Sequence, residues 1–179
     1  MSNKLTLTLR SSLITCLFLL VIVKHVNAQE KDIYELDNAT IAKTQGQVNK
    51  GKYKKGSSLD RVEFYNLIEN IYTTYYVNNG KIKKAYGDGK PKKLALRGTG
   101  AFNYLKTANH NFKNIEIITI TLDTISEIQN TMDLSSLKGF DNLKYIFIRC
   151  YFKPNEAQIK SFIKTKEHNR VFYKMENPS

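Results

Sequence analysis

Residues able to carry catalysis or bind metal are sparse after the first 28 positions of this chain. The histidines there are His110 and His168, and the cysteine is Cys150. A zinc site needs several His, Cys or carboxylate ligands at short spacings, so none can be written. With Asp123 and Glu127, His110 gives the one hydrolase site that the sequence suggests, although carboxylate pairs are common on surfaces. Cys150 is interpreted as a small buried hydrophobe, with pairing between two chains as the alternative.

Two glycine-containing segments match nucleotide-binding motifs only in part. Gly98-Thr99-Gly100 lacks the third glycine of a dinucleotide fingerprint. Gly89-Lys90 is followed by Pro91, where a phosphate-binding loop carries Ser or Thr. The sequence therefore predicts no catalytic residues, no cofactor and no metal, and an enzyme is the least favoured class.

Basic side chains are the more prominent chemical feature. The formal charge is +12, and residues 43–97 hold thirteen Lys or Arg against four Asp or Glu. The excess is concentrated in residues 50–55 and 81–93. Candidate polyanion-binding residues are Lys52, Lys54, Lys55, Lys81, Lys83, Lys84, Lys92 and Lys93. Such segments attract polymers bearing phosphate, sulfate or carboxylate groups, although a solvated lysine-rich loop is the simpler interpretation.

The first 28 residues have the features of a secretory signal peptide. Two basic residues precede an apolar run of eleven residues at 13–23, which is shorter than the ~20 that span a bilayer. Val26-Asn27-Ala28 supplies the small residues of a cleavage site before Gln29. We expect a mature chain without a transmembrane segment, secreted or held in the periplasm or cell envelope. An envelope polyanion is then a better-placed partner than nucleic acid, which is not expected.

The first part of the mature chain contains one predicted helix. Residues 29–57 are polar and predict a partly ordered lead-in to a single domain at 58–179. Val62, Tyr65 and Ile68 follow a spacing of three and four residues, so a helix is predicted over about residues 59–76. Residues 81–93 are predicted to form turns and loop.

The second half of the chain has a recurring strand pattern. Residues 112–120 and 140–148 both read Phe-x-Asn-apolar-x-x-Ile-x-Ile, at a spacing of 28. Apolar-x-apolar steps recur after 24, 28 and 25 residues, starting at Leu94, Ile118, Ile146 and Val171. The gaps are long enough for crossovers, so these steps predict four neighbouring parallel strands. Recurrence at this period is typical of solenoids.

Residues 134–148 resemble a leucine-rich repeat, because their apolar residues step by threes and finally by two. The resemblance covers about residues 90–175 and is degenerate. Asp123 and Tyr151 stand where the family has Asn or Cys. The resemblance implies an α/β fold with a short array of about four parallel strands, preceded by an N-terminal helix. The alternative is a small α+β domain with strands that recur by chance.

A ligand of such a repeat protein meets the concave strand face. Candidate contacts are therefore the positions beside the strand apolars, Thr119, Thr121, Phe147 and Arg149. Phe147 could instead belong to the core, because strand phase is uncertain in a single sequence. The favoured function is an exported, non-catalytic binding or scaffold protein with an unknown protein partner. The alternative is a basic surface protein that binds anionic glycan or lipid headgroups, and a hydrolase is less favoured.

Overall fold

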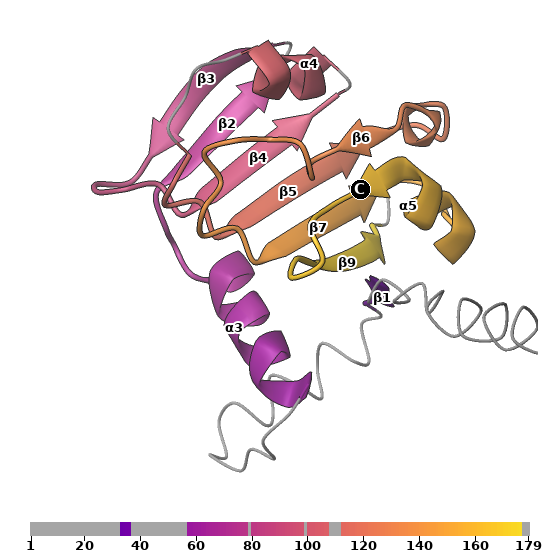
Figure 1. The fold of residues 1–179 in the computed structure, drawn as a ribbon, viewed down its shortest axis with the longest axis horizontal. Coiled ribbons are helices and arrows are strands. Elements are labelled where there is room, and N and C mark those ends of the chain that lie inside the picture. The colour runs from indigo at the N-terminus through magenta and orange to yellow at the C-terminus, as the bar shows by residue number, and fades with distance from the viewer. Residues whose placement is uncertain (1–32, 37–56, 79, 99, 108–111, 177–179) are drawn as a thin grey trace, which may run out of the picture. The chain divides into compact units, whose positions relative to one another are not determined.

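The computed structural model describes residues 33–36, 57–78, 80–98, 100–107 and 112–176. Its centre is a seven-stranded sheet (Figure 1) with the order β1-β9-β7-β5-β4-β2-β3. The strands are β1 (Ile33–Glu35), β2 (Thr74–Asn78), β3 (Lys81–Tyr86), β4 (Lys93–Arg97), β5 (Ile117–Leu122), β7 (Tyr145–Cys150) and β9 (Arg170–Met175). Neighbouring strands are parallel except β2 and β3, which form an antiparallel hairpin.

Three helices and a small second sheet complete the described fold. The helices are α3 (Ser57–Glu69), α4 (Gly100–Thr107) and α5 (Glu156–Phe162), with a 3-10 turn η1 (Glu127–Gln129). The second sheet pairs β6 (Met132–Asp133) with β8 (Ile163–Lys164) in parallel. Together with the mostly parallel main sheet, these elements establish an α/β fold.

The four predicted strands lie side by side, as the recurrence indicated. Leu94 pairs with Ile118, Ile118 with Ile146, and Ile146 with Val171, all in parallel register. The prediction of four neighbouring parallel strands is therefore confirmed. Membership of the leucine-rich repeat family remains a resemblance.

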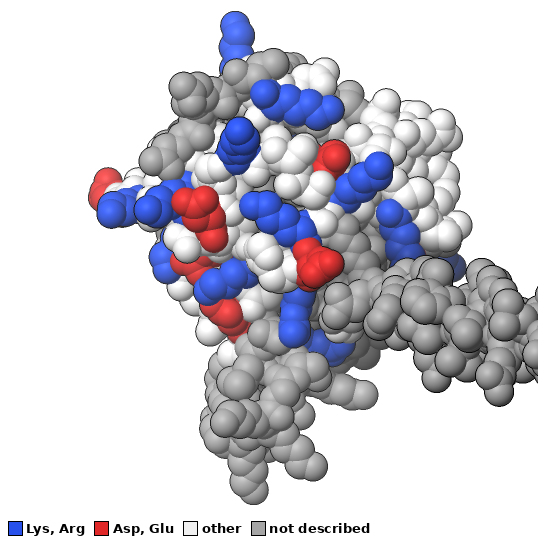
Figure 2. All heavy atoms as spheres, viewed as in Figure 1, with Lys and Arg blue, Asp and Glu red and all other residues white. Residues whose placement is uncertain are grey.

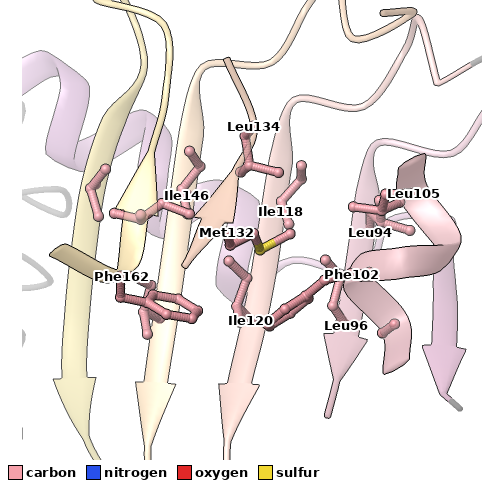
Figure 3. Close-up of a cluster of buried hydrophobic side chains, with 14 of the residues drawn as sticks. Leu94, Leu96, Phe102, Leu105, Ile118, Ile120, Met132, Leu134, Ile146 and Phe162 are labelled. Carbon is pink, nitrogen blue, oxygen red and sulfur yellow. The ribbon is translucent and has the colours of Figure 1, made fainter. Parts of the chain in front are cut away.

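The connections between these strands pack on one face of the sheet. Ile118, Ile120 and Ile146 point from the strands toward Met132 of β6 and Phe162 of α5 (Figure 3). Phe102 and Leu105 of α4 belong to the same buried cluster. Consecutive crossover connections lie on one side of the sheet, which is the arrangement expected when all of them have the same handedness. We call this side of the sheet the crossover face.

α3 packs on the opposite face, over the amino-terminal half of the strands. Its Phe64 is fully buried and stacks on Phe172 of β9, with ring centroids 4.2 Å apart. The same ring meets Phe147 of β7 edge-on at 5.4 Å. Ile117 and Tyr145 complete this second buried cluster. The carboxyl-terminal half of this face, which we call the open face, has no helix described over it.

Two predictions about residues 59–93 are wrong. The helix ends at Glu69 instead of Tyr76, and residues 74–78 form β2. Residues 81–86 form β3 instead of a loop. The stretch before Gly80 is rich in Thr, Tyr and Val, which favour strands once a neighbouring strand is present. Gly80, which has a φ of 71°, turns the chain into the hairpin.

The surroundings of β9 show two features that the sequence did not predict. Within residues 29–57, β1 adds an edge strand that pairs with β9. Just before β9, Asn169 is buried and its Nδ2 donates a hydrogen bond to the Leu143 carbonyl at 2.6 Å. This amide links the segments that lead into the neighbouring strands β7 and β9. The predicted signal peptide, residues 1–28, lies outside the described residues.

Candidate ligand-binding site

Strand register places a row of dissimilar side chains across the open face. Tyr76 of β2, Ala95 of β4, Thr119 of β5 and Phe147 of β7 are successive register partners. Their neighbours along each strand, such as Leu96 and Ile118, face the crossover core instead, because strand side chains alternate. The row therefore has two small residues between two aromatic ones.

This change of size creates a hollow of about 430 Å³. Ala95 and Thr119 form its floor, because their short side chains leave space between Tyr76 and Phe147. α3 closes the amino-terminal side with residues that include Tyr65 and Ile68. The full lining is Leu36, Tyr65, Ile68, Glu69, Thr74, Tyr76, Lys93, Leu94, Ala95, Thr119, Phe147, Arg149, Lys174 and Glu176.

A charged group closes the carboxyl-terminal side of the hollow. Arg149 Nε donates to Glu176 Oε1 at 2.9 Å, and Lys174 Nζ lies 3.1 Å from Glu176 Oε2. Burial acts to raise the pKa of Glu176, but the hydrogen bonds from Arg149 and Lys174 outweigh it and hold the pKa below its usual value. The group is thus a fixed network of one carboxylate between two cations.

Lys93 enters the hollow from the opposite side and has a structural partner. Its Nζ donates to the carbonyl oxygens of Ile68 at 3.2 Å and Asn70 at 3.1 Å. These carbonyls lie at the end of α3, where a cation interacts favourably with the helix dipole. Burial lowers the pKa of Lys93. The lysine therefore holds α3 against β4.

Three of the four predicted contact residues line the hollow. Thr119, Phe147 and Arg149 do so, whereas Thr121 lies in the next row between Arg97 and Arg149. Phe147 is only 7% exposed and also packs on α3. It therefore belongs to the core and to the hollow at once, which the sequence treated as alternatives.

The predicted polyanion-binding residues are not brought together within the described part of the chain. Lys93 is bound as above, and Lys92 is paired with Glu116 at 3.0 Å. Lys81 is exposed on β3, the strand that also carries Lys83 and Lys84. Lys52, Lys54 and Lys55 lie outside the described residues. On the face drawn in Figure 2, basic side chains are spread out with acidic ones between several of them.

The carboxylates of the suggested hydrolase site hold a turn together. Arg97 donates to both oxygens of Asp123, at 2.9 and 3.0 Å. Glu127 Oε2 accepts from the backbone N–H groups of Asp123 at 2.6 Å and Thr124 at 3.0 Å. His110 lies outside the described residues. Both carboxylates thus have structural partners at the end of β5.

Several lining residues were not foreseen from the sequence. Tyr76 was assigned to the helix, so its place on a strand face was missed. Ala95 and Lys174 occupy the same type of position beside strand apolars as Thr119, and this alternation could have identified them. Tyr65 and Ile68 come from α3, whose docking over the strands depends on contacts far apart in the chain.

The described residues show no group of three His, Cys, Asp or Glu able to hold a metal ion. In the same part of the chain, no helix is long and apolar enough to cross a membrane. No protein family matches the chain, and no curated protein or solved structure matches it.

Proposed function

We propose that the chain is an exported, non-catalytic binding protein that takes its ligand in the hollow of the open face. The observation that carries this proposal is that Thr119, Phe147 and Arg149 line one cavity of about 430 Å³. The cavity lies within the range of small-ligand sites, about 300–1,000 Å³. Its lining combines apolar and aromatic side chains with polar groups, several of which are held by hydrogen bonds, as such sites do.

The elements that form the hollow are held in place by their own packing, as in a preformed binding site. Its floor belongs to β4 and β5, which have strands on both sides. Its amino-terminal wall is α3, anchored by the fully buried Phe64. Binding to a site that is already ordered avoids the entropic cost of arranging it. This favours recognition of a ligand over a purely structural role for the open face.

Export supports a ligand found outside the cytoplasm. The signal-like segment, residues 1–28, motivates this step. The repeat-like array motivates the choice of the open face, since repeat proteins present a continuous strand surface to their ligands.

Replacing Ala95 with Leu tests the proposal, because the larger side chain fills the floor of the hollow. Ala157→Leu is the matched control, since Ala157 is exposed on α5. The thermal midpoint is measured with envelope components: neutral oligosaccharides, heparin, peptidoglycan fragments and short peptides. A ligand of the native state raises this midpoint by mass action. At least one component should stabilise the parent and Ala157→Leu but not Ala95→Leu; equal stabilisation of all three proteins would refute the hollow as the site.

The second candidate is polyanion binding through the basic segments, favoured by the exposed Lys81 on β3. Retention on heparin resin should then fall steeply with added salt. It should also fall when Lys81, Lys83 and Lys84 are replaced by Gln. Retention that ignores both changes would remove this candidate.

A further inference from the structure

The three cations that line the hollow already have partners, which favours a ligand without a strong net charge. Arg149 and Lys174 share Glu176, and Lys93 is bound to two backbone carbonyls. An anionic ligand would compete with these partners for each cation. A neutral polar ligand can instead add hydrogen bonds to the pairs without breaking them.

The Arg149–Glu176–Lys174 network presents donors and acceptors side by side. Arg149 uses Nε on Glu176, and its guanidinium has further N–H groups on a side chain that is 38% exposed. The ammonium of Lys174 likewise has further N–H groups, and each Glu176 oxygen can accept more than one hydrogen bond. A hydroxyl group both donates and accepts, so this alternation matches a ligand rich in hydroxyls.

An exposed aromatic pair stands at the other end of the floor. Tyr76 is 42% exposed and lines the hollow, and Tyr86 is 49% exposed beside it. Their rings meet edge-on at 5.6 Å and 86°, which restricts the orientation of Tyr76. The face of an aromatic ring is electron-rich, so it attracts the weakly positive C–H bonds of a sugar ring. The Tyr76 ring and the charged network thus lie on opposite sides of a floor of small residues. This arrangement suits a cyclic ligand whose faces are apolar and whose edge is polar.

We propose that the ligand of the hollow is a neutral carbohydrate. One sugar ring packs on Tyr76 above Ala95 and Thr119, and its hydroxyls bind Arg149, Lys174 and Glu176. This inference rests on the proposed function, because it names the chemical class of the ligand for the same hollow.

Calorimetric titration with cello-, malto-, xylo- and fully N-acetylated chito-hexaose tests the inference, with heparin and polygalacturonate as anionic probes. At least one neutral hexaose should bind. Tyr76→Ala should weaken it at least about tenfold, equivalent to about 1.4 kcal/mol. Tyr76→Phe should bind within about twofold of the parent, because the ring remains. Ile125→Ala is the control for loss of an exposed apolar side chain, since Ile125 is 55% exposed and does not line the hollow.

The effect of ionic strength and the Ala95→Leu variant, which fills the hollow, separate the possible outcomes. Hexaose affinity should change little when the ionic strength rises from about 0.01 to about 0.15 M, although the Debye length falls from ~30 to ~8 Å. Ala95→Leu should abolish hexaose binding. The inference is overturned if no neutral hexaose binds, if Tyr76→Ala binds like the parent, or if only the anionic probes bind. A peptide that binds the parent but not Ala95→Leu would overturn the carbohydrate while leaving the proposed function intact.

Discussion

Ile146→Asp tests the packing of the crossover face most severely. Ile146 is fully buried as the second residue of β7, with Ile118 and Val171 as register partners on either side. Its side chain points into the cluster that all described crossovers share. Moving the connections aside would expose other apolar residues of this cluster, so the new carboxyl group must either stay buried or disrupt the packing.

The size of the effect follows from two contributions. Loss of the buried aliphatic side chain alone costs about 2–5 kcal/mol, as for Ile→Ala. A buried polar group without a partner adds about 1–3 kcal/mol. A domain of this size has a total stability of about 5–15 kcal/mol. The variant is therefore expected to lose most of its stability or to be unfolded.

Urea unfolding of the parent and two variants measures this cost. Thr121→Asp is the control, because Thr121 lies on the open face with Arg97 and Arg149 as register partners. An aspartate there meets cations and solvent, so its midpoint should stay close to that of the parent. If Ile146→Asp unfolds at the parent's urea concentration, the shared core on the crossover face is wrong.

Three further outcomes are expected. The hydrogen bond from Lys144 is the main reason that the pKa of Glu63 lies below its usual value of 4.5. Around and below that pH, the native state therefore binds fewer protons than the unfolded state. The stability of the native state should then fall as the pH drops below about 4.5. Glu63→Gln should flatten that acid limb in thermal midpoints measured against pH, and an unchanged limb would contradict the ion pair. Burial raises the pKa of the Cys150 thiol to about 12, so a thiol reagent should modify it only after denaturation; rapid labelling of the native protein would disprove this. Mass spectrometry of the exported protein should find Gln29 at the amino terminus, whereas an intact residue 1–28 segment would exclude cleavage.

The central strands could be predicted because their signal is local and repeated. Ile118 and Ile146 each begin a step in which alternate residues are apolar, and the steps recur at nearly constant spacing. In a parallel sheet, equal positions in successive units become register partners, so recurrence in sequence becomes adjacency in space. Leu94 and Val171 follow the same rule at the two ends of the series.

The edges of the sheet could not be predicted in the same way. Residues 72–76 satisfy the spacing of a helix as well as the composition of a strand, and only pairing with β3 and β4 decides between them. β1 has three residues and exists through its pairing with β9, more than 130 positions away. Such elements depend on partners that a local pattern does not contain.

The hollow exists because α3 covers only part of the face on which it packs. Phe64 contacts Phe147 and Phe172, so the helix lies over the amino-terminal half of β7 and β9. Beyond it, the floor falls to the small Ala95 and Thr119. Phe147 stands at the boundary, because it packs on Phe64 of α3 and also lines the hollow. Phe147 thus belongs to both the core and the candidate site, because the edge of the core forms a wall of the hollow. Any change that loosens α3 must therefore also reshape the hollow, so stability and ligand binding should be lost together in variants of this boundary.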